Sequence, residues 1–131
     1  MATSASHLFA VAVGGAVGAS LRYLVSVAWL GIPAMPAWPW ATFFVNVLGS
    51  LLFGLLAVGL AAATAANEHL RFALMTGLLG AFTTYSTFSF EMVRMLQTRA
   101  FGLALGYGSG TIAACVVAAG LGLWLGRLVF E

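Results

Sequence analysis

The chain has 131 residues, of which 63% are hydrophobic and only 6% are charged, and its mean hydropathy is +1.08. A soluble domain of this size needs far more polar surface, so the composition indicates a single integral membrane domain over residues 1–131. Five basic residues against three acidic ones are too few for the clustered basic face of a nucleic-acid-binding protein. The single cysteine, Cys115, excludes an intrachain disulfide.

Four apolar stretches follow one another along the chain. A helix crosses the bilayer in about 20 residues, and short segments rich in proline, glycine or polar side chains divide the sequence at about that interval. The four tryptophans fall near the ends of these stretches, where amphipathic rings favour the membrane interface. The sequence therefore predicts an all-α integral membrane protein with four transmembrane helices, at about 8–30, 40–63, 71–95 and 103–125.

The distribution of arginines leaves the orientation of this bundle open. Four crossings place both termini on one side, to which Arg71 and Arg127 belong. The other side would carry Arg22, Arg94 and Arg99, so the arginines divide two against three between the two sides of the membrane. Either the chain inserts in both directions and forms an antiparallel dimer, or one arginine is assigned to the wrong side. The charges alone favour neither explanation.

The third predicted helix has an unusual middle, because glycine and hydroxyl residues occupy positions 77–89, where a lipid-facing helix prefers leucine and isoleucine. Such residues lower helix propensity and offer the backbone other hydrogen-bond partners. We predict a break at about 80–84, which would leave carbonyls and amides free to meet an ion. In the alternative, the hydroxyls bond back to the carbonyl one turn earlier and the helix stays intact.

Polar residues also recur on one face of the second and of the fourth helix. Thr42 and Asn46 are four residues apart, and the face continues through Gly49 and Phe53. An amide in mid-membrane either joins helices or lines a wet path, and the hydroxyl-rich third helix favours a path for Asn46. On the fourth helix, Tyr107, Thr111 and Cys115 share a face in the same way.

Other signals have a packing or an electrostatic interpretation. Gly14 and Gly18, like the glycines of the fourth helix, indicate close helix packing. Arg22 either extends to the headgroups or stands in a water-filled vestibule that attracts anions. Glu91 and Arg94, three residues apart, are expected to form a local ion pair. The sequence contains no recognisable catalytic set, so we do not expect an enzyme.

Three stretches resemble the CrcB/Fluc family of fluoride channels. They are GGAVGASLRY at 14–23, WATFFVNVLGS at 40–50 and TTYSTFS at 83–89, the last followed by Glu91. The resemblance implies an antiparallel, dual-topology homodimer in the inner (plasma) membrane of a microbial cell. Each dimer would have two pores that let fluoride leave the cell passively. A structural sodium ion would lie at the dimer centre, held by the backbone carbonyls of Gly80 and Thr83.

The resemblance also implies an ion path. Asn46 would be the pore amide, Tyr85 and Phe88 the pore aromatics, and Arg22 the vestibule residue. Tyr85 stands where the family pattern has phenylalanine, and Cys115 stands where a hydroxyl would extend the polar track of the fourth helix. The residues expected along the path are Arg22, Thr42, Asn46, Tyr85, Ser86, Thr87, Phe88, Tyr107 and Thr111.

Two other functions fit a short membrane protein. A proton-coupled exporter of the small multidrug type needs a membrane-embedded carboxylate near the centre of its first helix, where this chain has none. Glu91 is its only candidate. A helper subunit would use its glycine faces to dock onto a partner without transporting anything itself.

Overall fold

The computed structural model describes residues 5–30, 38–61 and 68–131. Every regular element in these ranges is a helix, which confirms the all-α prediction. Three helices are long and apolar enough to cross a membrane: α1 (Ala5–Leu30), α2 (Trp40–Gly59) and α6 (Phe101–Phe130). Their length and composition are those of a multi-pass membrane protein.

Between α2 and α6 the chain forms several shorter helices. The first three follow one another without a gap over residues 68–82: α3 (Glu68–Arg71), the π-helix η2 (Phe72–Leu79) and α4 (Gly80–Phe82). After two extended residues the chain continues as α5 (Tyr85–Gln97). Of the residues predicted to form a break, 80–82 are therefore helical and only 83–84 are not. The π-helix has no counterpart in the sequence prediction.

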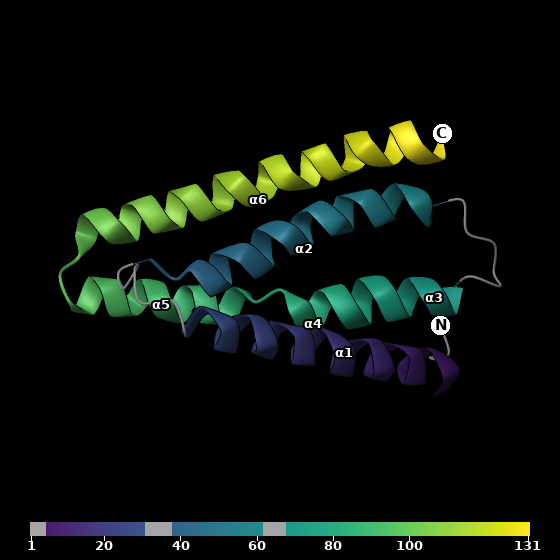
Figure 1. The fold of residues 1–131 in the computed structure, drawn as a ribbon, viewed down its shortest axis with the longest axis horizontal. Helices are drawn as coiled ribbons and strands as arrows, with labels where there is room; N and C mark the ends of the chain where they lie inside the picture. The colour runs from purple at the N-terminus through teal and green to yellow at the C-terminus, as the bar shows by residue number, and fades with distance from the viewer. Residues whose placement is uncertain (1–4, 31–37, 62–67) are drawn as a thin grey trace.

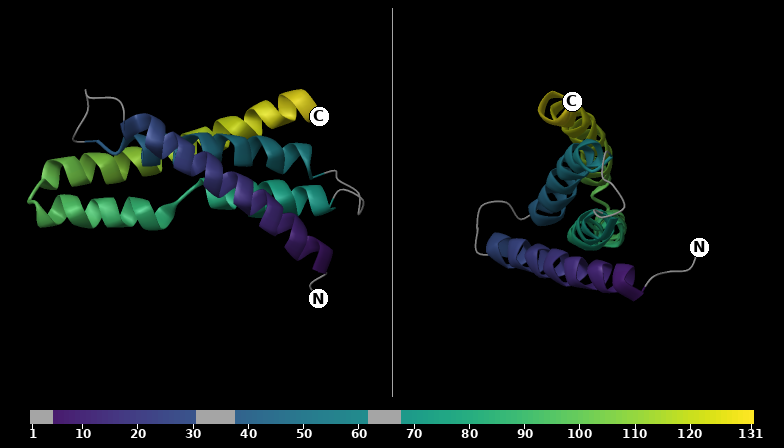
Figure 2. Two further views of the ribbon diagram at one scale, coloured as in Figure 1. Left: turned by 60° about the horizontal axis from the view of Figure 1, so that its bottom comes forward. Right: turned by 90° about the vertical axis from the view of Figure 1, so that its right-hand side faces the viewer.

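The helices lie in two layers (Figure 1). In the first layer α2 packs along α6, and in the second α1 packs against η2 and α4. Figure 2 shows α1 crossing the other helices obliquely rather than running parallel to them. The start of α1 and the end of α6 lie at the same end of the bundle, and the turn between α5 and α6 lies at the opposite end.

Glycines allow the backbones of α1 and η2 to come into direct contact. A Cβ at Gly14 would overlap the carbonyl oxygen of Ala73, and a Cβ at Gly18 would overlap that of Leu78. From the other side, a Cβ at Gly77 would lie 2.6 Å from the carbonyl oxygen of Val11. The packing role predicted for Gly14 and Gly18 is confirmed, and their partner is the π-helix η2.

A second glycine contact joins α2 to α6. A Cβ at Gly54 would overlap the carbonyl oxygen of Ala119, and a Cβ at Gly122 would overlap that of Leu51. In contrast, a Cβ at Gly106 or Gly120 would meet no other described atom within 4 Å. The packing prediction for the fourth helix therefore holds for Gly122, while Gly106 and Gly120 make no such contact within this chain.

Large apolar side chains remain exposed along the outer faces of the bundle. On α6 they include Leu105, Val116 and Val117, which are 73%, 67% and 69% exposed. A soluble monomer does not keep a surface of this kind in water. Lipid, or another subunit, must cover it.

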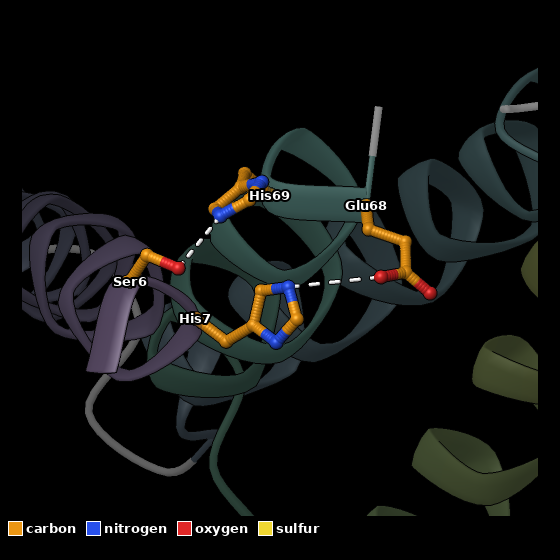
Figure 3. A network of polar contacts seen from close by, with 4 residues as sticks. All are labelled: Ser6, His7, Glu68 and His69. Atoms are coloured by element: carbon orange, nitrogen blue, oxygen red, sulfur yellow. Dashed lines mark hydrogen bonds and ion pairs between the residues drawn. The ribbon is translucent and has the colours of Figure 1, made fainter. Parts of the chain in front are cut away.

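A small polar cluster joins α1 to α3 where α1 begins (Figure 3). The Nε2 atom of His7 lies 3.6 Å from Oε2 of Glu68, and Nε2 of His69 lies 2.9 Å from the hydroxyl of Ser6. The two imidazole rings are also in contact, with centroids 4.7 Å apart. These residues come from two segments about 60 positions apart, and no local sequence pattern indicates that they meet.

Candidate functional site

The interruption between α4 and α5 consists of two residues with extended backbone. Thr83 has φ −81° and ψ 158°, and Thr84 has φ −150° and ψ 117°. In a continuous α-helix each amide donates to the carbonyl four residues earlier, so the amides of Thr84 and Thr87 would bond to Gly80 and Thr83. Here the Thr84 amide donates to Oδ1 of Asn46 at 2.8 Å, and the Thr87 amide donates to the Thr84 hydroxyl at 3.2 Å.

Asn46 connects the middle of α2 to the interruption through both ends of its amide. Its Oδ1 accepts from the Thr84 amide, and its Nδ2 donates to the Thr84 carbonyl at 3.0 Å. The paired bonds hold the side chain and the extended residue in one orientation. Of the two roles considered for Asn46, joining helices is the one that the hydrogen bonds display.

The threonine hydroxyls at the interruption act in two different ways. Thr84 is the N-cap of α5, because its hydroxyl accepts the Thr87 amide, and it also donates to the Thr87 hydroxyl at 3.0 Å. Thr83 bonds back to the Leu79 carbonyl at 3.0 Å, as in the intact-helix alternative. The Thr84 hydroxyl therefore caps the start of α5, and the Thr83 hydroxyl bonds to the last carbonyl of η2.

Arg22 extends from α1 to the carboxyl end of α4. Its Nε donates to the carbonyl oxygen of Ala81 at 3.0 Å, and the side chain is half-buried. The predicted surroundings of Arg22 were the headgroups or a vestibule, and this bond to the backbone was not predicted. The bond joins residues 59 positions apart, and no local sequence pattern indicates it.

A second polar cluster forms around Glu91 of α5. One carboxylate oxygen accepts the Thr42 hydroxyl at 2.7 Å, and the other accepts the Tyr107 hydroxyl at 2.6 Å. The carboxylate thus joins α2, α5 and α6, and both of its donors are buried. The predicted ion pair with Arg94 is wrong, since His7 and Glu68 form the only ion pair among the described residues. A carboxylate inside an apolar helix was itself a signal, because such a group needs close partners.

An open groove of about 370 Å³ lies beside the interruption and is here called the Asn46 groove. It is bounded by α2, the two extended threonines, the start of α5 and the middle of α6. The hydroxyl oxygen of Thr111 is buried there and has no hydrogen-bond partner within the described part of the chain. The residues lining the groove are Asn46, Gly49, Ser50, Phe53, Thr83, Thr84, Tyr85, Phe88, Thr111, Ile112, Cys115 and Val116.

Comparison with known proteins identifies the family. Residues 9–123 match the model of the family described as CrcB-like protein, Camphor Resistance (CrcB). The chain belongs to this family. The family resemblance noted in the three sequence stretches is therefore confirmed.

Curated relatives of this CrcB-like chain cover almost its whole length. It is 46% identical over 127 residues to the fluoride-specific ion channel FluC of Phenylobacterium zucineum, spanning 94% of this chain and 97% of that one. It is 44% identical over 122 residues to the protein of the same name from Magnetococcus marinus, spanning 91% and 96%. The FluC of Chloroflexus aurantiacus is 38% identical over 125 residues, spanning 92% and 98%.

In this CrcB-like chain, four of the predicted path residues meet in one place. Asn46, Tyr85, Phe88 and Thr111 all line the Asn46 groove. The rings of Tyr85 and Phe88 have centroids 5.7 Å apart, but Phe88 is 7% exposed and Tyr85 is 78% exposed. The other predicted residues do not line the groove; they are Arg22, Thr42, Ser86, Thr87 and Tyr107.

Two further hollows differ in character from the groove. One of about 450 Å³ lies between α1, α2 and the segment 78–82, and only apolar side chains line it. The other, of about 340 Å³, lies near the turn between α5 and α6 and includes Glu91 and Arg94. Glu91 therefore borders a hollow at the end of the bundle, while its hydroxyl donors come from inside.

Proposed function

We propose that this chain is a passive, fluoride-selective ion channel that lets fluoride leave the cell across the inner (plasma) membrane. The observation that carries the proposal is the Asn46 groove, in which an amide, hydroxyls and aromatic rings meet beside an interrupted helix. The names of the relatives, fluoride-specific ion channel, support the same ion.

The groove suits a small and strongly hydrated anion. A pore that conducts such an ion must replace its water with donors, which amides, hydroxyls and the positive edges of aromatic rings can supply. The Thr111 hydroxyl lacks a partner in the described structure, and the neighbouring Phe88 presents a ring. Several weak sites in sequence let the ion enter and leave, which conduction requires.

We propose a path that extends beyond the groove itself. The Phe88 and Tyr107 rings have centroids 5.2 Å apart, and the Tyr107 hydroxyl leads on to Glu91 and Thr42. This continuous set of polar and aromatic side chains runs from the groove toward the hollow near the α5–α6 turn. The proposed path also includes Ser86 and Thr87, which lie in the first turn of α5 between Tyr85 and Phe88.

We further propose that four crossings, the third interrupted at 83–84, assemble as an antiparallel homodimer with two pores. The arginine distribution supports insertion in both directions. Arg22 lies at the interruption and so counts for neither end of the bundle. Two arginines remain at each end: Arg71 of α3 and Arg127 of α6 at one, Arg94 of α5 and Arg99 of the following turn at the other.

The backbone around the interruption fits the proposed structural sodium ion. Gly80 and Thr83, whose carbonyls would hold it, are among the residues whose usual amide donors bond elsewhere, since the Thr84 and Thr87 amides have other acceptors. Carbonyl oxygens are suitable ligands for a hard cation. Two copies related by a two-fold axis would supply both pairs of oxygens to one ion at the dimer centre. The ion would add a positive charge that holds the two interruptions together.

Ion efflux from liposomes tests the proposed channel. Purified protein reconstituted with no partner should release fluoride rapidly and chloride hardly at all. Phe88→Ile and Asn46→Ala should reduce the fluoride rate. Equal rates for the two anions would refute selectivity. Uphill fluoride movement that follows a proton gradient would indicate the exporter instead, and no flux from folded protein would favour a helper subunit.

A further inference from the structure

We propose that Arg22 serves as a hydrogen-bond donor that fixes the carboxyl end of α4 at the interruption, and that its role is not to attract anions by charge. The bond from its Nε to the Ala81 carbonyl is the starting observation. The inference rests on the proposed channel function only where ion flux is the readout. In this role Arg22 is a positioning residue.

The Ala81 carbonyl needs a donor because the helix stops. In a continuous helix it would accept the amide of Tyr85, but the extended backbone of Thr83 and Thr84 directs the chain away. A carbonyl without a partner in apolar surroundings costs several kcal/mol. The guanidinium supplies the missing donor, and its charge also faces the negative end of the helical segment 68–82.

The position of this donor is fixed by backbone contacts. Arg22 follows Gly18 by four residues and so lies on the same face of α1. Gly18 packs directly against the backbone of Leu78, which leaves α1 little freedom to move relative to this segment. The side chain therefore starts from a fixed point close to the end of α4.

Arg22 and Asn46 hold the interruption from opposite directions along the chain. Arg22 of α1 binds the last turn before it, and Asn46 of α2 binds Thr84 within it. Thr83 itself bonds back to the Leu79 carbonyl, so the Arg22 bond steadies the segment to which Thr83 is attached, and the Asn46 bonds fix the residue that follows it. Because Thr83 and Thr84 line the Asn46 groove, the two side chains together shape its wall.

The surroundings of Arg22 argue against a charge that acts on the ion. Arg22 does not line the Asn46 groove. Its neighbours Leu21 and Leu24 line the apolar hollow between α1 and α2. The Ala81 carbonyl is the acceptor that the structure gives this guanidinium, and it belongs to the backbone at the end of α4.

Three substitutions separate the donor from the charge. In glutamine the amide nitrogen is attached to Cδ, as Nε is in arginine, so Arg22→Gln keeps a donor at the same place and removes the charge. In lysine and methionine a carbon atom takes that place. Arg22→Lys therefore keeps the charge but moves the donor, and Arg22→Met loses both. Arg127→Gln, in the last turn of α6, is the matched control for loss of one positive charge.

Fluoride efflux from liposomes should rank these variants by donor and not by charge. Arg127→Gln should stay close to the unmodified protein. Arg22→Gln, which loses only the favourable charge at the end of α4, should lose about two- to threefold. Arg22→Lys and Arg22→Met should lose about tenfold, the factor that corresponds to one hydrogen bond of this kind. An Arg22→Lys rate equal to or above that of Arg22→Gln would overturn the proposal. If Arg22→Met does not fold, the glutamine and lysine variants still decide the question.

Hydrogen exchange gives a readout that does not depend on conduction. Amides of residues 83–87 should exchange about tenfold faster in Arg22→Lys and Arg22→Met than in Arg22→Gln, because the end of α4 is no longer fixed. Exchange that is the same in all three variants would overturn the proposed role even if fluoride flux were normal. A protein that conducts no fluoride but shows this exchange pattern would refute only the channel.

Discussion

Two polar clusters connect α1 or α2 to the helical segment 68–97, and they differ in whether water could replace their hydrogen bonds. At the interruption, Arg22 and Asn46 bind backbone groups between apolar helices. At the end of the bundle, His7 and Glu68 form a pair whose side chains are 25% and 55% exposed (Figure 3). Water can take the place of either partner at the exposed end, whereas at the interruption each bond also fixes the course of the backbone. The stabilising effect of each bond therefore depends on its surroundings more than on its length.

The largest loss of unfolding free energy is expected at Gly18, because its packing against η2 fixes the position of Arg22 at the interruption. Gly18→Ala places a methyl group against the Leu78 carbonyl, so α1 must move and carry Arg22 away from Ala81. Overpacking together with the lost bond should lower the free energy of unfolding by about 3 kcal/mol or more. Unfolding in detergent measures this. Gly120→Ala is the control, since a methyl there meets no other described atom within 4 Å, and equal losses in both variants would contradict the assignment.

The next largest effect concerns the amide that restrains Thr84. Asn46→Ala removes both hydrogen bonds that fix the extended backbone of Thr84, and should cost about 2 kcal/mol of unfolding free energy. Ser50→Ala, one turn along the same helix, removes only a hydroxyl bonded to the carbonyl of Asn46. It should change the unfolding free energy far less. The comparison of the two clusters would fail if the two variants were equally stable.

A smaller loss of unfolding free energy is expected at Glu91, whose carboxylate accepts hydrogen bonds from two hydroxyl groups. Tyr107→Phe removes one of the two hydrogen bonds, at a cost of about 1.5 kcal/mol. Thr42→Val removes the other. Because both act on the same group, the double variant should depart from the sum of the single ones. Strict additivity in detergent unfolding would show that the two hydroxyls do not share the carboxylate.

Features that depend on neighbouring residues in the sequence could be predicted, whereas contacts between distant residues could not. The three long helices and the packing of Gly14 and Gly18 could be predicted, because periodicity and composition describe each helix locally. The hydroxyl-rich stretch indicated the region of the interruption, but helical structure persists through Phe82. Helix spacing shows which face a side chain occupies and not which helix that face meets. Arg22 and Glu91 were therefore given wrong or incomplete surroundings, since their partners lie 16 to 59 positions away.

The smallest effect should be at the exposed end of the bundle. Glu68→Gln removes the charge opposite His7, and exposed pairs of this kind contribute about 0–1 kcal/mol even when the imidazole is protonated, so the unfolding free energy should change little. His69→Ala serves as a companion variant, because it removes the contact with Ser6 at the same end. A loss in either variant as large as that of Asn46→Ala would mean that water does not replace these bonds. The two clusters would then differ in position but not in their contribution to stability.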